Sequence, residues 1–284
     1  MSSLALQEKV RARYHVQCHG ASAAEANQTL VLAHGFGCDQ QIWQALLPFL
    51  VADPLMAKYR VVTFDYAGCG RAAPELLGER SYRDLQHYAH DLQQVCQAFA
   101  PNEAIVLAHS ISGAIAFLAS LESPSFARKI IAIGPSACYL NHPETGYVGG
   151  FERQDIEGLL DMMERNYFDW AGYLAPQVMA NSDRPEYSEA LRSKFLATNP
   201  THARRFAEVT FFIDIRDKLP QVATPVELLY CDNDIIVPTS AIYYIAEKLP
   251  HAHVHHVEGA SGHYPHMSAP AAVAAIVQQL VAEH

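Results

Sequence analysis

Short apolar runs alternate with helical patterns along most of this chain, and no other feature limits its possible folds so strongly. Seven runs have the length and composition of strands, at 14–18, 30–33, 61–64, 104–107, 130–133, 226–230 and 254–257. The first run alternates with polar residues, as in an edge strand, whereas most of the others are continuous, as expected where both faces are covered. The series predicts an α/β fold, a mostly parallel sheet flanked by helices.

Helical patterns fill the gaps between these runs. The clearest covers 81–100, where apolar residues recur at helical spacing after Ser81, the expected N-cap. Further helices are expected at 41–51, 111–121, 240–249 and 269–282. The interval between 133 and 226 has no strand pattern and contains several helical stretches, including 154–166 and 184–198. Such an insertion predicts a cap that shields a site from water. The alternative is a helical layer that only extends the core.

Composition and charge exclude several classes of protein. The chain has 284 residues, of which 50% are hydrophobic and 18% charged, so it is neither disordered nor collagen-like. Its formal net charge of -10 opposes binding to nucleic acid and to anionic membrane surfaces. The six cysteines are scattered without a C-x-x-C pair, and neither an apolar leader nor a membrane-length apolar run is present. We therefore expect a cytoplasmic protein.

The strongest local motif is Ala108-His109-Ser110-Ile111-Ser112-Gly113, between an expected strand and an expected helix. This is the context of a nucleophile elbow, in which a serine occupies a strained turn with its hydroxyl exposed at the end of the sheet. Ala108 and Ser112 replace the two glycines of the usual G-x-S-x-G pattern, although both are small. Taken alone, Ser110 could instead be the cap of a buried helix.

A second motif, His34-Gly35-Phe36-Gly37, also follows a strand and precedes a helix. Acyl transfer requires backbone N–H donors for the oxyanion, each worth about 3 kcal/mol. In α/β-hydrolases these donors come from the residue after the nucleophile, here Ile111, and from a loop such as this one, here Phe36. The alternative is a glycine-rich turn without a ligand.

The segment from Cys231 to Pro238 supplies a candidate acid directly after a strand. A carboxylate there can orient an imidazole and stabilise it when protonated. Asp234 is preferred over Asp232 because its spacing to Pro238 is typical of the acid loop in this architecture. The alternative is a solvated turn, which Asp and Asn favour by themselves.

His263 lies after the last expected strand and before the final helix, where it could act as a general base and then as an acid. His256 and His266 are its competitors. The order Ser110, Asp234, His263, with each residue at the carboxyl end of a strand, is the order of α/β-hydrolases. The sequence therefore predicts a Ser-His-Asp triad.

Other motifs carry less weight. The histidines at 251, 253, 255 and 256 could suggest a metal cluster, but alternation along one strand is more typical of a solvated edge. The loop at 64–70 contains G-x-G without a third glycine, so a dinucleotide site is not expected. We expect neither a metal nor an organic cofactor in the reaction.

The motifs together resemble one subfamily of α/β-hydrolases, which holds the bacterial regulators of the sigma-B stress response and the plant karrikin and strigolactone receptors. The resemblance covers residue 10 to the C-terminus. It rests on the segments 34–40, 109–113, 134–141, 149–152, 166–167, 234–238 and 262–268. The main departure is Ala108 in the place of the first elbow glycine, and its extra methyl group would affect the rate rather than the mechanism.

This resemblance implies an eight-stranded, mostly parallel sheet with a four-helix cap inserted after strand 6. The core would comprise 1–136 and 223–284, and the cap 137–222. A small hydrophobic pocket would lie between them, next to the triad, lined by Phe36, Tyr139, Trp170, Leu174, Phe211 and Ile111.

The function expected from these residues is a serine hydrolase for a small, largely apolar ester or lactone. One alternative is a ligand-binding signalling protein whose hydrolysis is slow or secondary, with a protein partner of the sensor-phosphatase type in stress signalling. Another is a cofactor-free, non-hydrolytic enzyme of the same fold.

Overall fold

The computed structural model describes residues 2–101 and 104–282. In these residues one sheet has the strand order β1-β3-β2-β4-β5-β6-β7. The strands are β1 (Gln17–Gly20), β2 (Gln28–Ala33), β3 (Tyr59–Thr63), β4 (Ala104–His109), β5 (Lys129–Ile133), β6 (Val226–Asp232) and β7 (Ala252–Ser261). Only β1 is antiparallel to its neighbour, so the predicted α/β fold with a mostly parallel sheet is confirmed.

The strand count is seven in the described residues, whereas the family resemblance implied eight. Each of the seven apolar runs has its strand, and the eighth has no counterpart in 2–101 or 104–282. The segment ahead of β1 instead forms helix α1 (Ser3–Tyr14), which ends at His15 with a left-handed φ of 47°. Tyr14, expected in the first strand, is therefore the last residue of a helix. Its side chain is fully buried.

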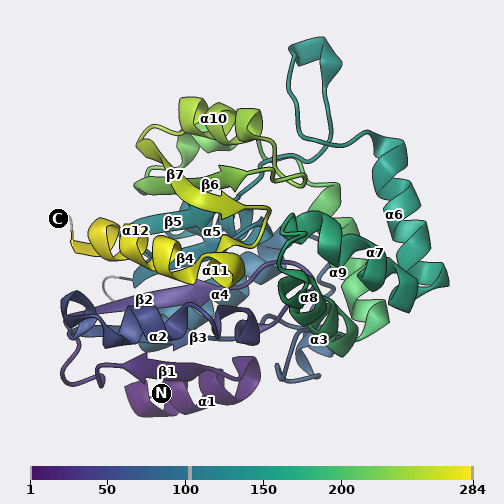
Figure 1. The fold of residues 1–284 in the computed structure, drawn as a ribbon. Helices are drawn as coiled ribbons and strands as arrows, with labels where there is room; N and C mark the ends of the chain where they lie inside the picture. Colours follow the sequence, from purple (N-terminus) through teal and green to yellow (C-terminus); the bar gives the residue numbers. More distant parts are fainter. Residues whose placement is uncertain (1, 102–103, 283–284) are drawn as a thin grey trace.

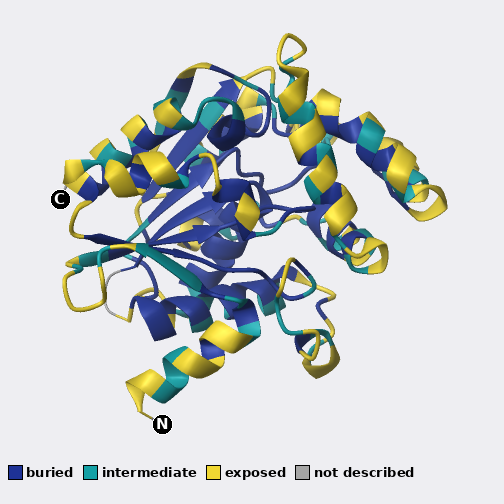
Figure 2. Ribbon diagram, turned by 60° about the horizontal axis from the view of Figure 1, so that its bottom comes forward, coloured by how far each residue is buried: buried dark blue, intermediate teal, exposed yellow. Residues whose placement is uncertain are grey.

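Helices cover both faces of the sheet. In front of it in Figure 1, α2 (Leu47–Ala52) packs on α12 (Pro270–Ala282), and on the other face α4 (Leu85–Phe99) packs on α5 (Ile111–Glu122). Helix α10 (Thr239–Lys248) packs on β6 and β7, and α3 (Leu76–Glu79) and α11 (Pro265–Ser268) are short. Figure 2 shows the result, with buried strands at the centre and helices that expose one side.

Two expected helices begin later than the sequence indicated. Ser81 is not the N-cap of α4, because Tyr82 has a left-handed φ of 44° and Asp84 accepts the capping bond from the Gln86 N–H. The stretch at 41–51 divides into a 3-10 turn, Gln40–Trp43, and α2. Pro48 stands in the first turn of α2, where its missing N–H costs no hydrogen bond.

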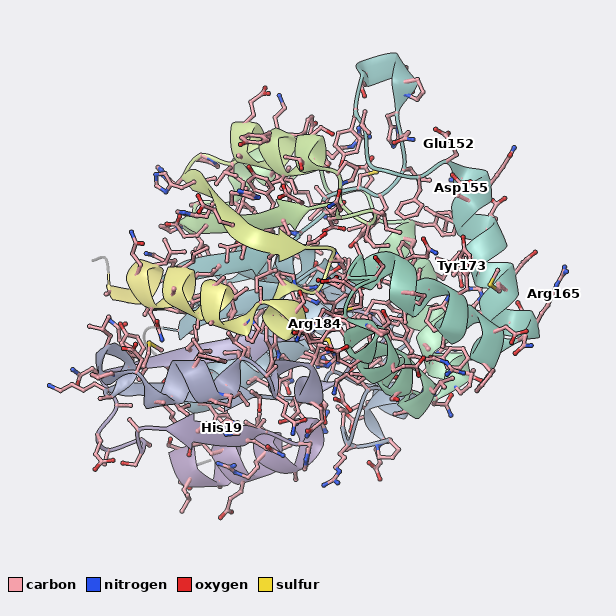
Figure 3. All side chains as sticks on the ribbon, in the orientation of Figure 1. His19, Glu152, Asp155, Arg165, Tyr173 and Arg184 are labelled. Atoms are coloured by element: carbon pink, nitrogen blue, oxygen red, sulfur yellow. The ribbon has the colours of Figure 1, made fainter. Side chains whose placement is uncertain are left out.

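Four helices connect β5 to β6, and they lie together past one end of the sheet, on the right in Figure 1. They are α6 (Arg153–Arg165), α7 (Tyr167–Met179), α8 (Pro185–Ala197) and α9 (Pro200–Phe211). Glu152 and Asp155 form a capping box at the start of α6, where Figure 3 labels them. We call α6–α9 the cap; the limits 137–222 stay a prediction. No helix in the described ranges is long and apolar enough to cross a membrane.

Candidate active site

Ser110 forms the sharp turn between β4 and α5. Its φ of 56° and ψ of -124° lie in a region that non-glycine residues rarely occupy. The turn is held by the Ser110 N–H, which donates to the Ile133 carbonyl at 2.8 Å. The side chain is 5% exposed. This is the backbone geometry expected of a nucleophile elbow.

The residues around the turn explain why the altered elbow motif still fits. Ala108 is fully buried within β4. The Ser112 hydroxyl donates to the His34 carbonyl at 2.5 Å and so ties the elbow to the loop after β2. The close backbone approach falls at Gly113, where an added Cβ would lie 2.5 Å from the Cβ of Pro135.

The structure brings Ser110, His263 and Asp234 into one hydrogen-bonded chain. The Ser110 Oγ lies 2.7 Å from His263 Nε2, and His263 Nδ1 lies 2.7 Å from Asp234 Oδ2. The other carboxylate oxygen accepts the backbone N–H groups of Ile236 and Val237 at 2.8 and 3.0 Å. Those bonds fix the carboxylate, which in turn orients the imidazole.

The competing residues lie elsewhere. Asp232 pairs with His256 at 3.1 Å on the exposed edge, away from Ser110. His266 is fully buried against the Trp43 ring, with 4.7 Å between ring centroids. Within the described chain neither ring nitrogen of His266 has a hydrogen-bond partner, and burial lowers its pKa to about 3. Neither competing histidine reaches the serine hydroxyl.

The loop after β2 passes close to the elbow. A Cβ added to Gly35 would lie 3.2 Å from the Ser110 Cβ, so a side chain at position 35 would crowd the nucleophile. Phe36, the next residue, lines the same cavity as Ser110. Ile111 is the first residue of α5, and helices leave their first N–H groups without intrahelical partners. Both expected oxyanion donors thus belong to backbone beside the serine.

His34 holds this loop in place. Its Nε2 accepts the Tyr66 N–H at 3.2 Å, so the proton sits on Nδ1, which donates to the Gly35 carbonyl at 2.9 Å. Burial lowers the pKa of His34, which keeps the ring neutral and able to make both bonds. His34 is therefore a positioning residue for the loop.

A small cavity opens on the serine. Four of the six expected lining residues lie there, and Ser110 and His263 form part of its wall. Ile111 and Trp170 do not line it; Trp170 is fully buried one layer behind, with its ring edge-on to Phe36 at 6.1 Å. The wall also contains residues that no sequence motif indicated, which are Val178, Phe195, Thr210, Ile236 and Tyr264. Their positions depend on how the cap sits over the sheet, which no local motif encodes.

The cavity is nearly closed. The space open to water is about 20 Å³, room for one or two water molecules. Aromatic rings of its wall pack on one another: Phe211 meets Phe36 edge-on at 5.7 Å and Tyr139 edge-on at 5.3 Å. Any substrate larger than water therefore requires cap or side-chain movement to enter.

His109 supports the imidazole from behind, a role that the sequence analysis did not assign. Its Nε2 lies 2.8 Å from the His263 carbonyl oxygen, and the two rings are 4.9 Å apart. Complete burial, reinforced by the neighbouring rings of His266 and His263, lowers the pKa of His109 well below its usual value. A neutral His109 can then donate from Nε2 to that carbonyl. The one sign of this role in the sequence is that His109 directly precedes Ser110.

These features define a hydrolase of the α/β class, and comparison with known proteins agrees. Residues 30–276 match the alpha/beta hydrolase family. The chain belongs to that family, and it is a hydrolase of the carboxylic-ester type.

Three similar proteins illustrate the relationship. A karrikin insensitive 2 receptor from Petunia hybrida is 34% identical, over 86% of this chain and 87% of its own. A strigolactone esterase from Arabidopsis thaliana is 30% identical, over 89% and 92%. The structure of a hydrolase from Oleispira antarctica superposes with a TM-score of 0.89 and 33% identity, over 98% of each chain. The resemblance to karrikin and strigolactone receptors is therefore confirmed.

Proposed function

We propose that the protein is a serine hydrolase that cleaves a small, largely apolar ester or lactone through Ser110, His263 and Asp234. The observation that carries this proposal is the continuous hydrogen-bonded chain from hydroxyl to imidazole to carboxylate, at the wall of an apolar cavity. No metal or organic cofactor takes part in the proposed steps.

In the first half-reaction, Ser110 Oγ attacks the acyl carbon while its proton passes to His263 Nε2. The carbonyl oxygen becomes an oxyanion, which the backbone N–H groups of Phe36 and Ile111 bind. Collapse of this intermediate breaks the bond to the leaving oxygen, which takes the proton from His263. A lactone opens at this step, and its alcohol stays attached through the acyl chain.

In the second half-reaction, water attacks the acyl-enzyme and gives its proton to His263. Collapse returns that proton to Ser110 and releases the carboxylic acid. Asp234 remains ionised throughout, because its role is to hold the imidazole in the required tautomer and to stabilise the imidazolium.

The test is covalent labelling by a serine-directed fluorophosphonate, followed by peptide mass spectrometry. We expect one adduct, on Ser110, and none in the Ser110→Ala variant. Ser120→Ala is the matched control: this buried serine further along α5 donates to the Phe117 carbonyl at 2.8 Å and has no part in the elbow, so labelling of Ser110 should persist. Absence of an adduct, or an adduct on another residue, would overturn the assignment.

A second candidate is a signalling protein that hydrolyses its ligand slowly. Two observations favour it: similar proteins are named receptors, and the nearly closed cavity requires movement when a ligand enters. A partner of the sensor-phosphatase type in a stress response could then detect the altered cap. Slow turnover, with changed hydrogen exchange in α6–α9 after acylation, would support this role. Fast, saturable turnover with an unchanged cap would count against it.

We also propose that the protein acts in the cytoplasm. All six cysteines are free thiols, and thiols persist in reducing compartments. Secretion of the natural protein in its host would contradict this location.

A further inference from the structure

The two segments that join the cap to the core meet outside the cavity. One leads from β5 to α6 and the other from α9 to β6. Cys138 and Asp214 face each other in an antiparallel bridge, and the Ile215 N–H donates to the Ala137 carbonyl at 2.9 Å. Beyond the bridge, the first segment makes the excursion that rises above the fold ahead of α6 in Figure 1. His142 stands in that excursion, where it pairs with Tyr147.

Three metal-ligating atoms converge at this junction. The Cys138 Sγ lies 3.5 Å from His142 Nε2, which lies 3.8 Å from Asp214 Oδ2, and all three atoms are within 4.8 Å of one another. In a tetrahedral zinc site, with Zn–S near 2.3 Å and Zn–N near 2.05 Å, the sulfur and nitrogen are about 3.6 Å apart. The thiol and imidazole already have that separation. The imidazole nitrogen and the carboxylate oxygen are 3.8 Å apart, which exceeds the about 3.4 Å of such a site by only about 0.4 Å.

A second layer of charged groups orients these ligands. Glu144 Oε1 lies 2.9 Å from His142 Nδ1, which directs Nε2 toward the thiol. Arg216 holds the Asp214 carboxylate through bonds of 2.8 and 2.6 Å. Each carboxylate oxygen has two lone pairs, so Oδ2 can accept from Arg216 and still bind a metal. A carboxylate behind a ligating histidine is characteristic of zinc sites.

The charges also suit a divalent cation. Without one, Asp214 and Glu144 carry two negative charges and Arg216 one positive, which leaves a charge of -1. A divalent cation with a Cys138 thiolate brings the sum to zero. The thiolate is the form of cysteine that binds metal ions, and a bound cation stabilises it. A thiolate, an imidazole and a carboxylate together favour zinc over the harder magnesium and calcium.

We propose that Cys138, His142 and Asp214 bind a zinc ion, with the fourth position open to water. The side chains of His142 and Asp214 are 26% and 41% exposed, so the ion can reach the site from solvent. Tyr139 follows Cys138 directly, and Phe211 lies three residues before Asp214; both line the cavity. The zinc thus ties together the two segments on which the outer wall of the cavity depends. Asp214 lies 72 residues from His142, so sequence spacing gave no sign of the set.

The test is a titration of the chelator-treated full chain with zinc alone, and with cobalt as a spectroscopic probe. We expect one ion per chain, a thiolate-to-cobalt charge-transfer band and a rise in Tm with zinc. Cys138→Ser should abolish the band and, like His142→Ala, weaken zinc binding by more than about tenfold; Glu144→Gln should weaken it by about tenfold.

Two controls separate this site from other thiols and imidazoles. Cys18→Ser removes the half-buried thiol beside Arg60, and His255→Ala removes an imidazole paired with Glu227. Both should bind zinc as the unmodified chain does. The proposal is overturned if no zinc binds at micromolar concentrations, if His142→Ala binds it undiminished, or if His255→Ala loses it. If Cys138→Ser does not fold, zinc binding by His142→Ala decides the question, because the His142 side chain is partly exposed and its loss should be tolerated. Fluorophosphonate labelling of Ser110 in His142→Ala checks that its fold is retained.

Discussion

The backbone N–H of His263 donates a 2.8 Å hydrogen bond to the carbonyl of Val178, near the end of cap helix α7. Gly262, the residue before His263, allows the loop to come this close to α7. Its φ is 84°, and a Cβ there would clash with the Met179 carbonyl. The loop that carries the imidazole is therefore docked against the cap. Any movement of α7 that accompanies substrate entry therefore changes the support of the imidazole.

Asn181 provides the first test of this coupling. Its side-chain amide donates to the Ser261 carbonyl at 3.1 Å and to the Met179 carbonyl, so it links the end of α7 to the histidine loop. The net contribution of one hydrogen bond to stability is about 1 kcal/mol. We expect Asn181→Ala to lower kcat on a small ester by about fivefold to tenfold, with a smaller change in KM.

The control for Asn181 is Ser261→Ala. It removes only an exposed side-chain bond to Asn233 and leaves the carbonyl that Asn181 binds. Its kcat should match that of the unmodified enzyme. Equal kcat values for Asn181→Ala and the unmodified enzyme would show that the loop holds the imidazole without the cap.

Asp234→Asn tests the acid of the proposed triad. Its Oδ1 can still accept the N–H groups of Ile236 and Val237, so the loop should keep its shape. The amide nitrogen would face His263 Nδ1 and favour the wrong tautomer. We expect kcat to fall by about 10⁴-fold. Asp232→Asn is the matched control, because the Asp232 side chain pairs with His256 at the surface, and its kcat should stay within about twofold. Similar losses in both variants would contradict the assignment.

Features of the fold that depend on local sequence could be predicted before the structure. The apolar runs at 30–33, 104–107 and 130–133 each lie in a strand, because continuous burial leaves a direct mark on composition. Ser110 could be singled out because the elbow is a property of a few consecutive residues. Asp234 and His263 could be singled out because each follows a strand, and the carboxyl ends of parallel strands meet at one edge of the sheet.

Other features depend on contacts between distant segments, and sequence patterns did not give them. Trp170 has the composition of a pocket residue, yet its ring stacks on Tyr167 at 5.0 Å behind the wall. Ser81 is a good cap by type, but Tyr82 turns away to reach Asp91 on α4. The proposed zinc site joins Cys138 and His142, which precede the cap helices, to Asp214, which follows the last of them. In each case tertiary packing selects between local options of similar energy.

Ala108→Gly tests the departure from the usual elbow motif. Ala108 is buried in a central strand, and glycine there costs about 0.5–1 kcal/mol of backbone entropy. We expect urea denaturation to show that loss and kcat to be unchanged, because the close approach to α5 occurs at Gly113. Gly113→Ala should cost more, since its Cβ would lie 2.5 Å from the Pro135 Cβ. A marked rise in kcat for Ala108→Gly would instead show that its methyl group distorts the elbow.

Leu174→Ala tests the size limit of the cavity. Leu174 lines the cavity from α7, and its truncation adds room beside Ser110. One extra or missing methylene in a hydrophobic pocket changes the discrimination between substrates by about 1–3 kcal/mol. The preferred acyl chain should therefore lengthen by one or two carbons. The measurement is kcat/KM across esters of increasing acyl length. Leu196→Ala, at a 36% exposed position on α8, is the control and should keep the original preference. An unchanged preference in Leu174→Ala would place the acyl group elsewhere.

Asp91 gives the fold a dependence on pH that is separate from catalysis. Its carboxylate is fully buried on α4 and accepts the hydroxyls of Tyr14 and Tyr82 at 2.9 and 3.0 Å. Burial raises the pKa of Asp91 to about 7, although these hydroxyls and Arg80 act in the opposite direction. The unfolded value is near 3.8, so between the two pKa values the folded state binds more protons. The contribution of Asp91 to stability therefore falls as pH rises, by up to about 1.4 kcal/mol per pH unit.

Asp91→Asn should remove this dependence and keep both tyrosine hydrogen bonds. Burial lowers the pKa values of His109 and His266, which makes the fold less stable in acid, so the wild-type curve alone mixes opposite trends. The difference between wild type and Asp91→Asn isolates the carboxyl group. Urea denaturation from about pH 5 to about pH 7 should show the wild type losing stability relative to the variant. Asp183→Asn, at an exposed position, should track the wild type. A constant difference between wild type and Asp91→Asn over that range would mean that Asp91 is ionised throughout.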